Sequence, residues 1–317
     1  MNYYSRKFMN YHYIELKKLL SAPRIGTYEN FFVDHTEEEI YGIYIWNKVL
    51  CGAIYPLLQA VEITLRNTIN NAAVNKFGPY WHELIDHVPH FSGSDDYNYT
   101  NLKSNFEEAR KNWIRKENKR RTSAGQVKLP YNHKPDFNCV VAETDFSTWE
   151  FSLHSCFYML TPPTGSKFLW PILLTSVFKN WPYQSSQKTR NAVYSLVSEL
   201  RPFRNRLSHH EPLWKGVGIT NETEALNFIN KKIDSIEKLL QIISTDKIEF
   251  IRSKKIISKA KSLATKEALD IFRNRGKSIN LTLRRKTKLK KFIFSLNENS
   301  GPKIVTISGR KLLIDLA

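Results

Sequence analysis

The spacing of apolar residues constrains the fold of this chain more than any other feature. Within residues 55–74, apolar residues follow one another at steps of three and four, which places them on one face of an α-helix. The apolar positions of this stripe are Leu58, Val61, Leu65, Ile69 and Ala72. A second stripe, within residues 221–243, consists of Leu226, Ile229, Ile233, Ile236, Leu240 and Ile243. Since one-sided stripes of this period are typical of packed helices, we predict an all-α fold, a helical bundle.

Local signals set the expected ends of the first helices. Three glutamates at positions 37–39 favour a helix over about 37–50, because carboxylates stabilise the positive end of the helix dipole. The helix over 55–74 is expected to end at the Gly-Pro pair of residues 78–79. A charged, exposed helix is expected over 103–121.

The second half of the chain carries similar signals. A helix that starts near Gln187 is expected to be kinked or ended by Pro202. Asn221 is a plausible N-cap for the next helix, because Glu224 follows three residues later. Residues 303–317 alternate in polarity around a glycine, which is compatible with a small terminal β-hairpin.

Composition and cysteine content exclude several classes of protein. Of the 317 residues, 41% are hydrophobic, which is too many for a disordered tail and enough for one large domain or two ordinary ones. The three cysteines are far apart, which disfavours a disulfide framework and a cysteine-based zinc site, and we expect no metal and no cofactor. The uncharged apolar runs at 49–61 and 168–178 are too short to span a bilayer, and the N-terminus lacks a signal-peptide core. We therefore expect a cytoplasmic protein without a membrane span.

Positive charge is concentrated near the C-terminus. The net charge is +18, and residues 251–291 alone contain 15 lysines and arginines against 2 acidic residues. We therefore divide the chain into a helical domain, residues 1–245 with a polar and basic insert at about 82–134, and a basic C-terminal extension, residues 246–317. Such an excess predicts an acidic partner, either nucleic acid or an anionic membrane surface, and we favour RNA. The residues of the extension predicted to bind RNA are Arg252, Lys254, Lys255, Arg273, Arg275, Arg284, Arg285, Lys286 and Lys288.

Residues 201–214 combine three arginines with two adjacent histidines. Arginine is permanently charged and binds phosphate oxygens in a forked geometry, and histidine both takes and gives a proton near neutral pH. Such a set is sufficient for RNA cleavage without a metal: a base takes the 2′-OH proton, an acid protonates the 5′-oxygen, and an arginine stabilises the phosphorane. The segment lacks carboxylates in metal-ligand spacing, which disfavours a two-metal nuclease.

A purely structural role for these residues is the alternative. Arg204, His209 and His210 also suit the end of a helix, where cations complement the dipole and the last carbonyls. Asn205 either orients a partner or caps the helix, and Arg206 is either a phosphate contact or an exposed helix charge. On a helix, Arg204 and His209 are separated by about 140° and do not share a face. We expect the helix to end near His209, with the histidines turning back, and a site made of two such ends, one per subunit, would remove the geometric difficulty.

Residues 204–212, which read RNRLSHHEP, resemble the RNRxxHHEP motif of the Abi family, the AbiD/AbiF-like abortive-infection proteins. This family belongs to the HEPN superfamily, whose ribonucleases carry an arginine followed four to six residues later by a histidine. Two further stretches are similar to the family, LLQAVEITLRNTI at 57–69 and DFSTWEF at 145–151. The resemblance covers roughly residues 16–245 and does not include the basic extension.

The resemblance implies an all-α, HEPN-like bundle that forms a homodimer with one composite site. It implies metal-independent RNA cleavage that leaves 2′,3′-cyclic phosphate ends, with Arg204, Asn205, His209 and His210 as the catalytic residues. The implied setting is bacterial phage defence or toxin–antitoxin control, in some members with a small noncoding RNA as partner. Two other functions stay open: a non-catalytic RNA-binding protein that forms a ribonucleoprotein with a structured noncoding RNA, and a membrane-surface effector that uses the basic extension.

Overall fold

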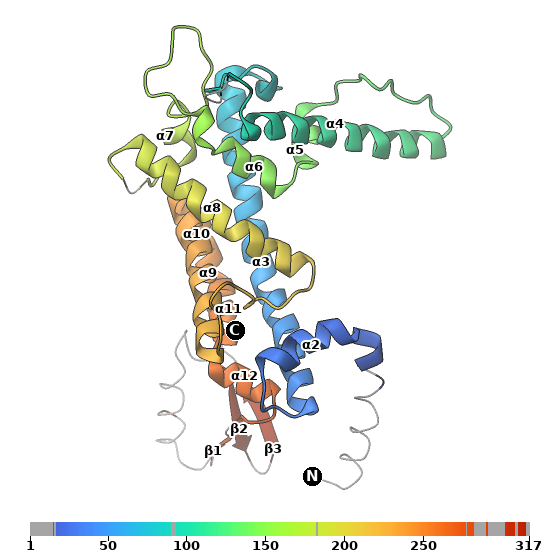
Figure 1. Ribbon diagram of the computed structural model, residues 1–317, viewed down its shortest axis with the longest axis vertical. Coiled ribbons are helices and arrows are strands. Elements are labelled where there is room, and N and C mark those ends of the chain that lie inside the picture. The colour runs from blue at the N-terminus through green and yellow to red at the C-terminus, as the bar shows by residue number, and fades with distance from the viewer. Residues whose placement is uncertain are drawn as a thin grey trace. The chain divides into compact units, whose positions relative to one another are not determined.

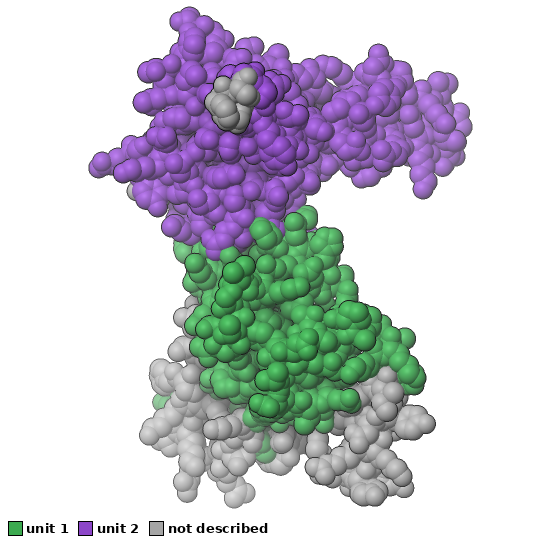
Figure 2. Space-filling view, viewed as in Figure 1, with its two compact units in different colours: residues 1–58, 202–237, 249–317 green, residues 59–201, 238–248 purple. Residues whose placement is uncertain are grey.

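The computed structural model is predominantly helical over the residues it describes, which confirms the predicted all-α class (Figure 1). The described residues are 15, 17–89, 93–181, 183–276, 278–281, 290, 302–307 and 310–314. They form two compact units, shown in different colours in Figure 2. Unit 1 consists of Met1–Leu58, Pro202–Glu237 and Glu249–Ala317, and unit 2 consists of Gln59–Arg201 and Lys238–Ile248. Each unit contains residues from both sides of position 245, and the domain boundary placed there stays a prediction.

The helices fall into three groups by the unit to which their residues belong. Helices with residues in both units are α3 (Glu37–Phe77), α8 (Ser186–Ser208), α9 (Glu222–Ile243) and α10 (Thr245–Ser253). Unit 1 also contains α2 (Ala22–Phe31), α11 (Ile256–Leu263) and α12 (Lys266–Phe272). Unit 2 also contains η1 (Trp81–Glu83), α4 (Tyr97–Ser123), α5 (Phe137–Ala142), α6 (Phe146–Ser152), η2 (Ser155–Phe157) and α7 (Leu174–Val177). The charged helix predicted over 103–121 is confirmed as part of α4.

The two helices expected over 37–50 and 55–74 are one continuous helix, α3, so the predicted break between them was wrong. Pro56 lies inside α3, although a proline removes one helical hydrogen bond and crowds the preceding turn. The apolar stripe continues through this position, and fully buried residues on both sides of it are Ile54, Leu57 and Val61. Pro56 itself is exposed, so burial of the stripe outweighs the lost hydrogen bond.

Among the described residues, α3 is also the one helix that is long and apolar enough to cross a membrane. Its most apolar stretch of 18 residues has a mean hydropathy of 1.3. This stretch is longer than the uncharged run at 49–61, which by itself is too short to span a bilayer. Of the 18-residue stretch, 44% is buried inside the protein, and a core helix of this length meets the same criteria. The predicted cytoplasmic location stays a prediction.

The start of α9 and the terminal hairpin are as the sequence predicts. Asn221 caps α9, because its side-chain oxygen accepts a hydrogen bond from the backbone N–H of Glu224 at 3.0 Å. The Glu224 carboxylate in turn accepts from the backbone N–H of Thr220 at 2.8 Å. Strands β2 (Lys303–Ile307) and β3 (Arg310–Ile314) pair in antiparallel fashion and confirm the hairpin. A third strand, β1 (Ser278–Leu281), pairs in parallel with β2 and was not predicted.

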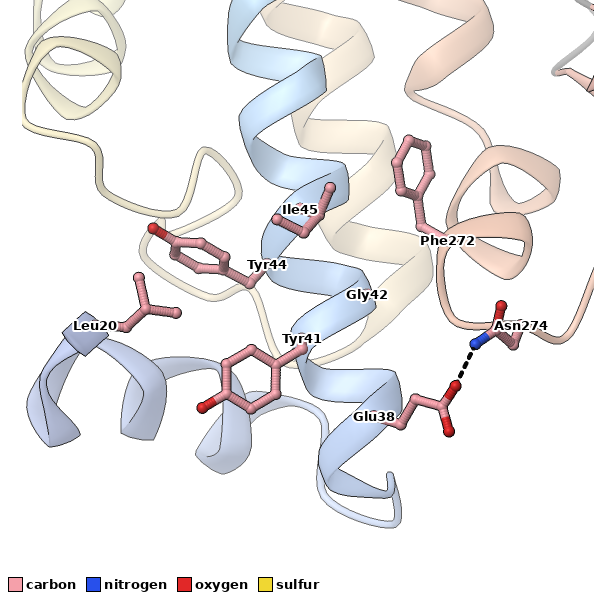
Figure 3. Close-up of a pocket in the computed structure, with 8 residues that line it drawn as sticks. All are labelled: Leu20, Glu38, Tyr41, Gly42, Tyr44, Ile45, Phe272 and Asn274. Atoms are coloured by element: carbon pink, nitrogen blue, oxygen red, sulfur yellow. Dashed lines mark hydrogen bonds between the residues drawn. The ribbon is translucent and has the colours of Figure 1, made fainter. Parts of the chain in front are cut away.

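Helix α12 of unit 1 docks on α3 at a glycine. A Cβ atom added to Gly42 would lie 2.1 Å from the backbone oxygen of Phe272, so only glycine permits this approach. Beside this contact Asn274 donates a hydrogen bond of 2.7 Å to Glu38 (Figure 3). The same region contains an apolar pocket of about 400 Å³, and Ile45 of α3 is one of the residues that line it (Figure 3).

Candidate functional site

The motif segment, which we define as residues 204–214, begins on the last turn of α8 and lies within unit 1. Helix α8 continues through Pro202, so the proline does not end it. Phe203 and Leu207 are buried and fix one face of this turn in the core. Asn205 is exposed, and Arg204 and Arg206 are half-buried. The three polar candidates of the motif therefore project from the outer part of a helix turn whose inner part is packed.

The chain reverses immediately after α8, and both histidines lie in the turn. Three backbone hydrogen bonds close this turn: His209 N–H to Asn205 O at 2.9 Å, His210 N–H to Leu207 O at 3.2 Å, and Glu211 N–H to Arg206 O at 2.9 Å. The last two are the paired bonds of a Schellman helix end. The prediction that the helix ends near His209 and that the histidines turn back is confirmed.

His210 occupies the position of this turn that requires a left-handed backbone. Its φ is 60°, a conformation that glycine adopts most easily and that costs other residues about 1 kcal/mol or more. The side chains of His209 and His210 are both exposed. The turn therefore presents two neighbouring imidazoles to solvent, one of them on a strained backbone.

Residues of α3 hold the backbone of the motif segment in place. Lys48 Nζ donates to the carbonyl oxygen of His210 at 3.0 Å. Asn47 is completely buried; its amide donates to the carbonyl of Glu211 at 3.4 Å, and its oxygen accepts from the N–H of Leu213 at 3.1 Å. Sequence reasoning missed both residues. The available signal was Asn47 itself, an amide within a core helix, where a buried polar group requires a partner.

Trp214 anchors the end of the motif segment in an aromatic cluster. Its ring centroid lies 5.1 Å from that of Tyr28, 5.4 Å from that of Phe32 and 5.8 Å from that of Trp46. The Trp46 indole in turn donates to the carbonyl of Leu263 on α11 at 2.8 Å. The segment is thus bound at its backbone and at its last side chain, while the side chains of His209 and His210 are exposed.

Three cations and one carboxylate, that of Glu211, belong to the turn and its surroundings. Burial lowers the pKa of Lys48, and the nearby positive charge of Arg24 acts in the same direction. The Lys48 ammonium binds the carbonyl that follows the helix end, and Arg204 and Arg206 precede it. Exposed imidazoles beside cations suit a phosphodiester substrate, since the cations bind phosphate oxygens and the imidazoles transfer protons.

The DFSTWEF stretch, the second similar segment, has a structural role within unit 2. Asp145 caps α6 by accepting a hydrogen bond from the backbone N–H of Thr148 at 3.1 Å. Glu150 is buried, and its carboxylate accepts from Ser198 Oγ and from Arg201 Nη1, each at 2.7 Å. These bonds fix the middle of α8 one turn before the motif begins.

Three of the arginines predicted to bind RNA in the extension, Arg252, Arg273 and Arg275, are paired with carboxylates. Arg252 binds Glu237 at 2.7 Å and Glu249 at 2.5 Å. Arg273, with 3% of its side chain exposed, binds Glu222 at 2.7 Å and also Asp270. Arg275 binds Glu39 at 2.8 Å. Each of these arginines ties helices of unit 1 together, and Arg273 is too buried to reach a phosphate in this arrangement.

Three lysines of the same region are exposed at its surface. Lys254 and Lys255 are exposed, as is Lys259 on the following helix. The remaining predicted RNA contacts lie outside the described residues: Arg284, Arg285, Lys286 and Lys288. The exposed cations of the described extension are thus mainly its lysines, and the RNA contacts assigned to Lys254 and Lys255 stay predictions.

One group of side chains in unit 2 has the composition of a metal site. Ligand atoms of Asp96, His154 and Cys156 lie within 4.8 Å of one another. Asp96 caps α4 by accepting from the backbone N–H of Asn98 at 2.7 Å, and His154 accepts from the backbone N–H of Cys156 at 3.4 Å. Burial raises the pKa of the Cys156 thiol, which opposes the thiolate form that a metal would need. We therefore interpret the group as a capping arrangement.

A model of the Abi-like protein family matches residues 1–215. The chain belongs to the Abi-like protein family. The match includes α2, α3 and the whole motif segment, and it ends directly after Trp214. The family description links the chain to abortive infection, a form of phage defence. No curated protein and no solved structure shows significant similarity to this chain.

Proposed function

We propose that this Abi-like protein is a metal-independent endoribonuclease of the AbiD/AbiF type within the HEPN superfamily. It would act in the bacterial cytoplasm, in phage defence or as the toxin of a toxin–antitoxin pair. One observation carries the proposal: Asn47 binds the backbone of the motif segment and Trp214 anchors its end in the core, yet His209 and His210 are exposed. A segment with a purely structural role has no need of two exposed imidazoles on a strained turn.

The proposed reaction is transesterification at phosphorus. One imidazole takes the 2′-OH proton of the RNA, and the 2′-oxygen forms a bond to the adjacent phosphorus. The bond from phosphorus to the 5′-oxygen breaks, and a second acid protonates that oxygen, so the products are a 2′,3′-cyclic phosphate and a 5′-hydroxyl. His209 is our first choice for proton transfer and His210 the second. Arg204 stabilises the charge on the phosphorane, and Asn205 orients a neighbouring group.

The proposed site is composite and belongs to a homodimer. Within one chain, ideal helical spacing would separate Arg204 and His209 by about 140°, so they would not share a face. Both side chains can reach one phosphate when Arg204 of one copy faces His209 of a second copy. The exposed end of α8 and its turn are suited to such pairing, because the backbone hydrogen bonds of the turn can all stay in place when two copies meet.

The test is RNA cleavage by the purified full chain in the presence of EDTA. We expect cleavage that survives EDTA, requires the 2′-OH and falls by about 10²–10⁴-fold in His209→Ala, which is the usual contribution of a general acid or base. His133→Ala, which removes a half-buried histidine of unit 2, is the matched control and is expected to cleave like the parent. Cleavage that EDTA abolishes, or equal rates in both variants, would contradict the proposal.

A second candidate function is a non-catalytic RNA-binding protein that forms a ribonucleoprotein with a small structured noncoding RNA. The exposed lysines Lys254 and Lys255, which lie beyond the family match, favour it. In this case an intact, discrete RNA co-purifies with the protein. Arg204→Ala weakens its binding, and no cleavage is detected with any RNA. Sequencing the co-purified RNA and measuring its length before and after incubation distinguishes the two functions.

A further inference from the structure

A pocket of about 530 Å³ in unit 1 lies between α3 and the segment that joins α10 to α11. Its floor is formed by α3, at Val49, Ala53 and Pro56. Lys254, Lys255 and Lys259 line it from the other side. The volume is within the usual range for small-ligand sites, about 300–1,000 Å³. One wall of the pocket thus belongs to the family domain, and the other lies beyond residue 215.

The lining is positively charged. None of the described residues that line the pocket is acidic, and all three of its lysines are exposed. Two neighbouring cations of the same region bind carboxylates: Arg252 binds Glu237 at 2.7 Å, and Lys261 binds Asp234 at 2.8 Å. The pocket thus combines three exposed lysines with an apolar floor, and it suits an anionic ligand.

An exposed aromatic ring lies beside the pocket. Phe250 on α10 is 57% exposed, and Lys254 Nζ lies 5.5 Å from its ring centroid. A large exposed phenylalanine next to a basic, partly apolar groove is characteristic of single-stranded nucleic acid binding, in which bases stack on aromatic rings while phosphates follow the cations. The aliphatic floor at Val49 and Pro56 offers a second apolar surface for a base.

We propose that this pocket binds single-stranded RNA, with one base against the floor, the flanking phosphates at the three lysines, and the next base on Phe250. This inference rests on the proposed function, because it assigns an RNA-binding contact outside the motif segment. RNA held there is either delivered to the motif segment or kept from cleavage. Lys48, which holds the His210 carbonyl, immediately precedes Val49 of the pocket floor on α3. The pocket and the contact that supports the motif turn therefore use adjacent residues of α3.

The experiment measures binding of a fluorescent, single-stranded 2′-O-methyl RNA, which cannot be cleaved by 2′-OH attack, as a function of salt. The test variant of the full chain replaces Lys254, Lys255 and Lys259 by glutamine. The matched control replaces three exposed lysines of unit 2, Lys119, Lys128 and Lys188, and so removes the same charge elsewhere. Phe250→Ala is measured separately, and circular dichroism checks that every variant is folded.

We expect the pocket variant to bind about tenfold more weakly and to lower the slope of log K against log salt by about 2, because each lost phosphate contact on a single strand contributes about 0.7. Phe250→Ala is expected to weaken binding by about fivefold or more, the lower limit for loss of one stacked base. The control is expected to remain close to the parent.

Each contrary outcome has a distinct meaning. If the parent binds RNA and the pocket variant matches it in affinity and slope, the pocket inference is wrong while the proposed function stands. If the parent binds no RNA, both fail. If the pocket variant instead loses binding to phosphatidylglycerol vesicles while its RNA slope is unchanged, the pocket is a lipid site and the inference is overturned.

Discussion

The motif segment and the C-terminal segment of residues 249–276 use their cationic side chains in opposite ways. In the motif segment, backbone groups are bound by α3, and the histidine side chains are left at the surface. In the C-terminal segment, arginine side chains such as Arg273 make the bonds that hold helices together. The difference teaches that net charge overstates the number of cations available to an acidic partner. Burial and partner, rather than residue type, decide which role a cation has.

The largest expected effect concerns the structural arginines. Replacement of Arg273 by glutamine should lower the free energy of unfolding by about 2–4 kcal/mol, because Glu222 and Asp270 lose their partner in a partly buried position. Lys259→Gln, at an exposed position, should change it by less than about 0.5 kcal/mol. Urea unfolding of both variants measures the difference. Equal effects would remove the distinction between the buried, paired cations of this segment and its exposed ones.

A glycine pair on α3 tests how tightly the C-terminal segment docks. Gly42→Ala should destabilise unit 1 by about 1–3 kcal/mol, since the new methyl group meets the Phe272 carbonyl oxygen. Gly52, on the same helix, has no atom within 4 Å of an added Cβ. Gly52→Ala should therefore stabilise the protein by about 0.5–1 kcal/mol through helix propensity alone. Thermal unfolding of the two variants gives opposite shifts if the docking is as described.

The motif segment depends on the buried side-chain amide of Asn47 for its support. Asn47→Ala should lower the free energy of unfolding by about 1–2 kcal/mol, because the buried N–H of Leu213 loses its acceptor. It should also lower the RNA cleavage rate of the folded fraction, since the turn that carries both histidines loses its support. Asn71→Ala, an exposed position of α3, is the control for both measurements. A rate unchanged from the parent would show that the turn does not need this support.

The smallest expected effect is a pH dependence of the arginine network. Burial of Glu222 favours its neutral form, but hydrogen bonds from Arg273 and Lys266 outweigh this and lower its pKa below 4.5. A carboxyl group whose pKa is lowered by folding adds stability above its unfolded-state pKa, and that stability is lost as the pH falls through the folded-state pKa. The difference in unfolding free energy between the parent and Arg273→Gln should therefore shrink below about pH 4.5. Urea unfolding at a series of pH values measures it, and a constant difference would contradict it.

Local sequence signals predicted those parts of the fold that local interactions determine. The N-cap at Asn221 and the hairpin in residues 303–314 follow from side chains and turns that are close in the sequence. The continuity of α3 through Pro56 did not follow, because it depends on burial along the whole helix. Strand β1 was missed because its parallel partner, β2, lies more than twenty residues away in the sequence and no local pattern specifies the pairing.

The candidate site was predicted in a similar, partial way. The turn at His209 follows from the proline after Glu211, which is a local effect. The support from Asn47 does not follow from any local effect, because its backbone partners lie 164 and 166 residues further along the chain. The structural roles of Arg273 and Arg275 were missed for the same reason, since Glu222 and Glu39 are 51 and 236 residues away from them.

Because the backbone of His210 is left-handed, a substitution of this residue can separate its effect on stability from its effect on the proposed chemistry. Glycine adopts that conformation without strain, so His210→Gly relaxes the turn and removes an imidazole in a single step. The expected variant melts at a higher temperature than the parent and cleaves more slowly, the reverse of ordinary damage to an enzyme. Histidine at this position makes the helix end less stable than glycine would, and in return it places an imidazole at the surface.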